Sequence, residues 1–232
     1  MQVTAHVHQL SGLLGSEVLG ANVFLLVDND LTLVDTGFRG RAKGIAVGIK
    51  RLGYSPSDVA RIIITHHHAD HAGSLAALKR LTRAEVIAHP ADAPYLDGSE
   101  PQPGPSRPRW LGKALAPAHR LWATTLAAVD TLVNEGDVLP MLGGTEILHM
   151  PGHTPGSICL FLEQEGLVIV GDVLVHRFGL RLPTRFFTVD IAQEIKSVKR
   201  LADVDFEVIA FGHGSPLMHG ARSRVARFAD RL

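Results

Sequence analysis

The sequence contains few residues of several kinds, and each shortage excludes a class of protein. One cysteine among 232 residues can form neither an internal disulfide nor a thiolate metal cluster. Basic and acidic side chains number 23 each, so no strongly positive field favours nucleic-acid binding. The apolar runs have the length of strands, well short of the roughly 20 residues of a membrane-spanning helix, and the first ten residues do not resemble a signal peptide. We therefore expect a cytoplasmic protein that binds neither nucleic acid nor membrane.

Hydrophobic residues make up 46% of the chain and the net charge is zero, which excludes intrinsic disorder. The length suits one domain that spans residues 1–232. Strands are predicted at residues 22–27, 31–35, 59–65, 85–89, 145–149, 157–162, 167–170 and 206–211, and helices at 42–52, 75–81, 191–201 and 223–232. Two β-rich halves, each followed by helices, predict an α+β fold in which two sheets pack face to face with helices outside.

The segment of residues 90–117 holds seven of the 13 prolines. Strands resume beyond it, so we expect a loop or an ordered insertion and not a domain boundary. Loops of this length inside a compact domain often form active-site walls. Four apolar residues in or after the segment could form a lid or pack in a helix over the core: Trp110, Leu111, Leu121 and Trp122. A homodimer contact through this segment is a further hypothesis.

Histidine is abundant, with 13 residues, and it is the commonest metal ligand. Residues 65–73 read Thr-His-His-His-Ala-Asp-His-Ala-Gly and lie between an apolar strand and a helix. In extended backbone, side chains two residues apart face the same way, so His66 and His68 converge, whereas His67 is expected to be exposed or hydrogen-bonded locally. Asp70 and His71 fall where the chain turns into the helix, a position that favours an acidic side chain. The run predicts ligands for two neighbouring metal ions; a histidine-rich surface turn is the alternative.

Three later candidate ligands, His153, Asp172 and His213, each follow an apolar strand and lie beside glycine. Glycine lets backbone segments approach closely, as a crowded site requires. Nitrogen and oxygen ligands without thiolate suit zinc, iron, manganese or cobalt, and their spacing does not choose among these metals. We expect two divalent ions, zinc first, with iron or manganese as alternatives. Cys159, in the middle of an apolar strand, is predicted to be a small buried hydrophobe.

Five motifs follow one another along the chain. They are Val34-Asp-Thr-Gly, His-x-His-x-Asp-His from residue 66, Pro151-Gly-His-Thr-Pro-Gly-Ser, Val170-Gly-Asp and Phe211-Gly-His-Gly. With these motifs the chain resembles the metallo-β-lactamase-fold superfamily, and within it the glyoxalase II and lactonase-like branch. The resemblance, which spans residues 22–216, implies an αββα sandwich of two mixed β-sheets. It also implies the ligands: His66, His68 and His153 for one metal, Asp70, His71 and His213 for the second, Asp172 bridging both, and Asp35 orienting ligands without binding metal.

The resemblance further implies a hydrolase in which a hydroxide that bridges the metals attacks the carbonyl carbon of an ester, lactone or thioester of a small-molecule substrate. Asp70 would be both ligand and proton shuttle. Lactonases of the fold place a tyrosine shortly after the bridging aspartate. This chain has other polar residues in that stretch as candidate substrate contacts: His176, Arg177, Arg181 and Arg185. An arginine there would favour an anionic substrate, although these arginines could equally lie on a solvated loop.

Three alternatives to this hydrolase are considered. An iron-dependent sulfur dioxygenase of the same fold typically uses one metal and a reduced ligand set. Most β-lactamases of the fold lack a bridging aspartate at the second metal. A non-catalytic metal-binding module would not require an acid, a bridge and an open site together. The complete ligand set, with Asp172 in it, favours the hydrolase over each of them.

Overall fold

The computed structural model describes residues 1–10, 20–103 and 124–232. Its strands are β1 (Val7–Gln9), β2 (Phe24–Val27), β3 (Leu31–Val34), β4 (Val59–Ile63), β5 (Glu85–Ala88), β6 (Thr131–Leu132), β7 (Val138–Leu139), β8 (Thr145–His149), β9 (Ile158–Leu162), β10 (Leu167–Ile169), β11 (Val175–His176), β12 (Leu180–Arg181) and β13 (Val208–Ala210). Its helices are α1 (Ala42–Arg51), α2 (Ala69–Ala72), α3 (Leu75–Thr82), α4 (Ala93–Asp97), α6 (Ile191–Leu201) and α7 (Ala221–Ala229), with short 3-10 turns η1 (Pro56–Asp58) and η2 (Glu163–Glu165).

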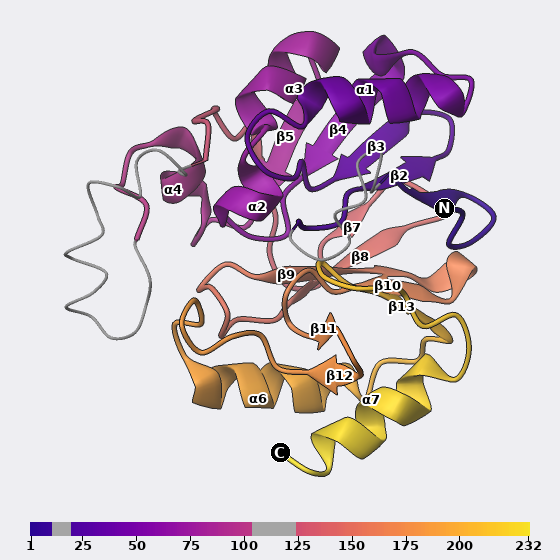
Figure 1. Ribbon diagram of the computed structural model, residues 1–232, viewed down its shortest axis with the longest axis vertical. Helices are drawn as coiled ribbons and strands as arrows, with labels where there is room; N and C mark the ends of the chain where they lie inside the picture. Colours follow the sequence, from indigo (N-terminus) through magenta and orange to yellow (C-terminus); the bar gives the residue numbers. More distant parts are fainter. Residues whose placement is uncertain (11–19, 104–123) are drawn as a thin grey trace.

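Two sheets pack face to face, and helices cover both outer faces (Figure 1). The first sheet has the order β1-β2-β3-β4-β5-β6, antiparallel from β1 to β3 and parallel from β3 to β6. The second has the order β13-β10-β9-β8-β7, in which β13 and β10 are parallel and the other pairs antiparallel. Helices α1 and α3 lie outside the first sheet, and α6 and α7 outside the second. The predicted α+β sandwich of two mixed sheets is confirmed.

Alternation of side chains along the strands produces these layers. In β4, Ile63 faces the core between the sheets, whereas Ile62, and Ile64 just after the strand, face the core under α1 and α3. In β10, Leu167 faces the core between the sheets and Val168 faces α6 and α7. Both faces are buried over residues 62–64 and over β10, so these segments read as continuous hydrophobic runs.

Most predicted elements agree with the structure. The strand at residues 145–149 and the helix at 191–201 have the predicted bounds. The last helix begins and ends earlier than predicted, at Ala221–Ala229, and Leu232 is 37% exposed. Strands β1, β6 and β7 and the hairpin of β11 and β12 were not predicted, because two or three residues are too few to show a periodic pattern.

Helix α4 lies within the proline-rich segment, which the sequence describes only as a loop or insertion. Pro94 is in the first turn of α4, where its missing N–H costs no hydrogen bond. Residues 104–117, and the four candidate lid residues, lie outside the described residues, so the lid, core-helix and homodimer hypotheses stay predictions. Within the described ranges, no helix has the length and apolar character needed to cross a membrane.

Strand ends bring the candidate ligands to one edge of the sandwich. Asp35 directly follows β3, and His66 follows the parallel strand β4. Asp172 follows β10, and His213 follows the parallel strand β13. The carboxyl ends of parallel neighbours lie at the same edge of a sheet, so the two members of each pair are brought together. His153 enters from the connection between β8 and β9.

Candidate metal centre

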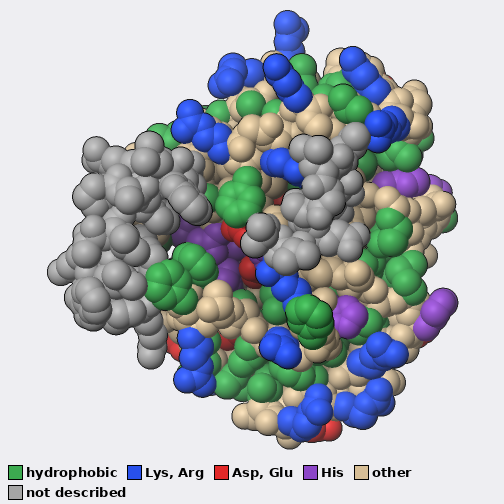
Figure 2. Space-filling view, in the orientation of Figure 1, with side chains coloured by type: hydrophobic (Ala, Val, Ile, Leu, Met, Phe, Trp, Pro, Cys, Tyr) green, Lys and Arg blue, Asp and Glu red, His purple; other side chains and the backbone are tan. Residues whose placement is uncertain are grey.

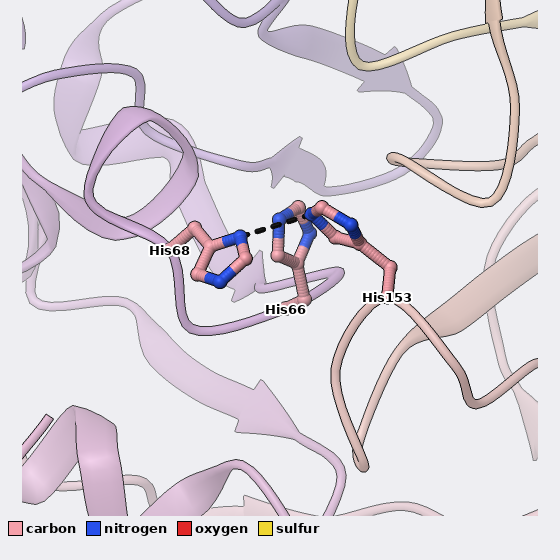
Figure 3. Close-up of side chains that lie close together, drawn as sticks. All are labelled: His66, His68 and His153. Carbon is pink, nitrogen blue, oxygen red and sulfur yellow. Dashed lines mark hydrogen bonds between the residues drawn. The ribbon is translucent and has the colours of Figure 1, made fainter. Parts of the chain in front are cut away.

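Three imidazoles form a first cluster, called here the three-histidine cluster (Figure 3). His66 and His68 come from the segment after β4, and His153 comes from the second sheet. The ring centroid of His66 lies 4.8 Å from the centroids of both other rings. Nδ1 of His68 lies 2.9 Å from Nε2 of His153, the contact that is dashed in Figure 3. The alternation of side chains along the chain predicts the pair of His66 and His68. The fold adds His153 to this pair from a loop of the other sheet.

Asp70, His71 and His213 form a second cluster, called here the mixed cluster. Asp70 and His71 lie in α2, which begins one residue after the last of the three consecutive histidines. Oδ2 of Asp70 lies 2.9 Å from Nε2 of His213 and 3.9 Å from Nε2 of His71. The short helix α2 therefore turns these two side chains toward the loop after β13.

Asp172 lies between the two clusters. Its Oδ1 is 3.4 Å from Nε2 of His71, and its Oδ2 is 3.3 Å from Nε2 of His213. The same Oδ2 is 3.6 Å from Nε2 of His153, which belongs to the three-histidine cluster. One carboxylate thus contacts candidate ligands of both clusters, and the structure brings all seven predicted ligand side chains to one place.

Hydrogen bonds on the far side of two rings determine which nitrogen faces the clusters. Nδ1 of His71 donates to Oδ2 of Asp35 at 2.7 Å, so the neutral ring would carry its lone pair on Nε2. The hydroxyl of Thr65 donates to the same carboxylate at 2.8 Å and lies 3.2 Å from Nδ1 of His66. It therefore accepts from that ring, whose lone pair is also on Nε2. Asp35 orients His71 directly and His66 through Thr65.

The pKa shifts differ between the two clusters. Burial lowers the pKa of His66, His68 and His153, the last to about 4, so these rings are neutral at pH 7. Burial alone would raise the pKa of the Asp172 carboxyl, but the His213 and His71 imidazoles beside it hold that pKa well below its usual range. Neutral imidazole and ionised carboxylate are the ligating forms. The three-histidine cluster and Asp172 are therefore already in the forms that bind metal ions.

In the mixed cluster, burial alone would lower the pKa of His71 and of His213, but Asp35 beside His71 and Asp172 beside His213 raise it, to about 9 for His213. A metal ion would therefore have to displace a proton from each of these rings.

Three buried polar atoms that face the clusters have no hydrogen-bond partner among the described residues: Nε2 of His66, Nε2 of His71 and Oδ1 of Asp172. An unpaired buried polar atom costs about 1–3 kcal/mol, and a bound cation would remove that cost. The donor set contains nitrogen and oxygen only, which suits divalent metal ions. The residues therefore fit divalent metal ions, as the sequence predicts.

Gly212 makes the close approach around Asp172 possible. A Cβ at this position would lie 2.4 Å from Oδ1 of Asp172 and 2.6 Å from Cε1 of His71. Both distances are far below van der Waals contact, so no other residue fits without displacing a candidate ligand.

The structure separates the four residues that were predicted to contact substrate. Arg177 is half-buried, and its Nη2 donates to Nδ1 of His213 at 2.9 Å. His176 instead uses its Nδ1 to donate to the carbonyl oxygen of Ser215 at 2.7 Å. The remaining two, Arg181 and Arg185, are exposed. Of the four side chains, that of Arg177 contacts a candidate ligand.

Histidine side chains are visible on the face of the molecule that Figure 2 draws. Figure 2 shows histidine and acidic side chains in a hollow near the middle of this face, with hydrophobic and basic side chains around it. Phe187 is 43% exposed, and its ring centroid lies 6.1 Å from that of His68. The approach to the clusters therefore offers apolar surface to an organic molecule.

His67 corrects one expectation. It is 2% exposed, and its Nδ1 lies 2.9 Å from Oδ2 of Asp92, a residue 25 positions away. The expectation of an exposed or locally bonded side chain is wrong, because protein, including Asp92, covers the side of His67 that faces away from the ligands. Sequence reasoning also missed Thr188, whose hydroxyl accepts from Nδ1 of His153 at 3.2 Å. No local pattern marks either partner, since each is distant along the chain.

Comparisons with known proteins agree with this geometry. The family model described as the metallo-β-lactamase superfamily matches residues 17–213. The chain belongs to this superfamily. A crystal structure of a metallo-β-lactamase family protein of Thermus thermophilus superposes with a TM-score of 0.77 at 22% identity and covers 99% of this chain and 80% of the other. That likeness shows the shared fold.

Two curated relatives are similar in sequence. The probable metallo-hydrolase YflN of Bacillus subtilis (strain 168) is 29% identical over 242 aligned residues, which cover 95% of this chain and 91% of the relative. An N-acyl homoserine lactonase of a Bacillus species is 29% identical over 173 residues, 71% of this chain and 60% of the relative. Family membership and the ligand clusters together support a metal-dependent hydrolase.

Proposed function

We propose that this protein is a dinuclear metal-dependent hydrolase that cleaves an ester, lactone or thioester bond of a small-molecule substrate. The observation that carries the proposal is the position of Asp172, whose Oδ2 lies 3.6 Å from His153 and 3.3 Å from His213. A carboxylate shared between two ligand clusters can bind a pair of adjacent ions, one with each oxygen. The similarity to an N-acyl homoserine lactonase supports a lactone among the candidate substrates.

The two clusters would hold one divalent ion each, with Asp172 shared between them. Zinc is the metal that we propose first, and iron and manganese are the alternatives, because all accept nitrogen and oxygen ligands. When bound, two such ions supply an acidified water as nucleophile and a Lewis acid for the carbonyl oxygen.

Asp70 is the residue that we assign to proton transfer. Its side chain is 24% exposed, against 8% for Asp172, so it is the more open of the two carboxylates to a substrate. A carboxylate in this position can take a proton from the attacking water and pass it to the leaving group. Asp70→Asn keeps the size of the side chain and removes the base, so it should leave little activity.

Arg177 indicates an anionic substrate. Its guanidinium donates to Nδ1 of His213. When His213 acts as a ligand through Nε2, Nδ1 carries the ring proton and no longer accepts from Arg177. The guanidinium is then free to contact an anionic substrate bound beside His213, and its planar fork suits a carboxylate. Arg177→Gln should therefore lower kcat/KM for a carboxylate-bearing ester and leave a neutral ester of the same alcohol unaffected; Arg181→Gln, exposed on the same hairpin, is the control.

The test of the function is hydrolysis by the protein after metal removal and after separate loading with zinc, manganese or iron. The substrates are lactones of varied acyl length, thioesters, nitrophenyl esters and β-lactams. We expect turnover by the loaded protein and little by Asp70→Asn. Full hydrolytic rate in a metal-free sample would contradict the mechanism. No turnover across the panel would favour a non-catalytic module, and one iron per chain with oxygen uptake on a persulfide would identify a sulfur dioxygenase.

A further inference from the structure

Asp92 is a buried carboxylate that lies close to the metal centre without belonging to either cluster. It is 1% exposed and stands at the N-cap position of α4, where an aspartate commonly accepts from the helix backbone. Its side chain makes no such capping hydrogen bond. Both carboxylate oxygens instead accept hydrogen bonds from two loops that carry candidate ligands.

The first of these loops is the one that follows β4. Oδ2 of Asp92 accepts from the backbone N–H of His67 at 2.8 Å, and the Nδ1 of the same residue lies 2.9 Å away. His67 stands between His66 and His68 in the chain, so the position of its backbone determines where both ligands project. Its ring is also packed against Tyr95 of α4, with centroids 4.6 Å apart.

The second loop follows β8 and carries His153. The hydroxyl of Thr154, the next residue, donates to Oδ2 of Asp92 at 2.8 Å, and the N–H of Gly156 donates to Oδ1 at 2.8 Å. The fit is tight, because a Cβ on Gly156 would lie 2.6 Å from Oδ1. One carboxylate thus joins a loop of the first sheet to a loop of the second, next to the ligands that each supplies.

The consequence for the three-histidine cluster follows from its composition. His68 and His153 come from different sheets, yet their nitrogens lie 2.9 Å apart. The backbone N–H of Ile158 also donates to the carbonyl oxygen of Thr65 and joins the two loops. This hydrogen bond lies where the loops meet strands β4 and β9. We infer that Asp92 is a positioning residue that holds the two loops in register and thereby sets the metal affinity of the three-histidine cluster, but not that of the mixed cluster. The inference rests on the proposed metal centre and does not depend on which bond the enzyme hydrolyses.

The test is cobalt(II) titration of the full-length protein, followed by visible absorption, together with metal content after dialysis. Asp92→Asn replaces one acceptor oxygen by an amide nitrogen, which donates and cannot accept. We expect affinity for one of the two ions to fall about 10–100-fold, the range for loss of a group that supports metal ligands. The comparison variant is Asp35→Asn, which should weaken binding of both ions, because Asp35 contacts His71 directly and His66 through Thr65.

Two further variants identify which ion is lost. His68→Ala lacks a ligand of the three-histidine cluster and His213→Ala lacks one of the mixed cluster, so their spectra define the remaining site in each case. The residual spectrum of Asp92→Asn should match that of His68→Ala. A folded Asp92→Asn with wild-type affinity for both ions, or one that resembles His213→Ala, would overturn the inference.

A milder variant keeps the inference testable if Asp92→Asn does not fold. Thr154→Val removes one hydrogen bond to Asp92 and keeps the shape of the side chain. It should weaken the same ion by a smaller factor, and equal weakening of both ions would refute the proposed role. Failure of the wild-type protein to hydrolyse any substrate while it binds two ions would contradict the proposed function alone.

Discussion

Glu194 offers a quantitative test of how the interior near the metal centre is built. It lies in the first turn of α6 and is fully buried, and neither carboxylate oxygen has a hydrogen-bond partner among the described residues. The turn packs directly on Gly152, where a Cβ would lie 2.4 Å from Cα of Glu194. Burial raises the pKa of this carboxyl from 4.5 to about 9, and it outweighs the opposing effect of the nearby backbone N–H of His153, which is too poorly aligned to form a full hydrogen bond. The folded protein therefore holds Glu194 as the neutral acid at pH 7.

The raised pKa has a definite sign for stability. Below pH 4.5, Glu194 is protonated in both the folded and unfolded states and contributes no pH dependence. Between pH 4.5 and about 9, only the unfolded state ionises, so stability falls as the pH rises. Over this range, each pH unit lowers the free energy of unfolding by about 1.4 kcal/mol. At pH 7, ionisation of Glu194 in the unfolded state has accordingly lowered the free energy of unfolding of the wild-type protein by about 3 kcal/mol. Glu194→Gln, of the same size and without charge, should recover most of it.

The assay is urea unfolding followed by circular dichroism from pH 5 to pH 9, with a chelator present throughout so that metal release does not contribute. The difference in unfolding free energy between Glu194→Gln and wild type should be small at pH 5 and grow toward pH 9. Glu163→Gln, on an exposed turn, should show no such trend. A difference that stays constant with pH would refute the reasoning, because it requires a pKa for Glu194 that folding does not shift. A variant less stable than wild type at pH 8 would also refute it, because that result requires a stabilised carboxylate.

Three further predictions concern the metal centre and its surroundings. Asp35→Asn should lower metal affinity about 10–100-fold in competition with a chromophoric chelator, and unchanged affinity would contradict the orienting role. Gly212→Ala should reduce the metal content of the purified protein, since its Cβ would lie 2.4 Å from Oδ1 of Asp172, whereas Gly44→Ala, with nothing within 4 Å, should not. The Cys159 thiol is buried, and burial raises its pKa, so a thiol reagent should modify it far more slowly in the folded protein than in urea.

The candidate ligands could be read from the sequence because the chemistry that marks them is local. An apolar strand followed by His-x-His-x-Asp-His brings four side chains together by backbone geometry alone, with extended residues first and a helical turn after them. The later ligands, His153, Asp172 and His213, are marked by apolar strands and adjacent glycines. Gly212 shows the physical reason, since a side chain there would collide with Asp172. Such local signals can be recognised in the sequence without knowledge of which strands pair.

The residues that hold the ligands in place were not predictable in the same way, and Asp92 shows why. Asp92 occupies the N-cap position of α4, where an aspartate commonly accepts from the helix backbone. Its side chain bonds instead to Thr154 and Gly156, which are 62 and 64 residues away. The carboxylate of Asp92 cannot face both the backbone N–H groups of α4 and the donors of the two loops. Which of these donors it faces depends on how the two sheets pack. The same holds for His67. Alternation predicts that it stays out of the cluster of His66 and His68, and its ring does lie outside that cluster, 4.9 Å from the ring of His68. Whether solvent or protein covers His67 is decided by Asp92, 25 residues further along the chain.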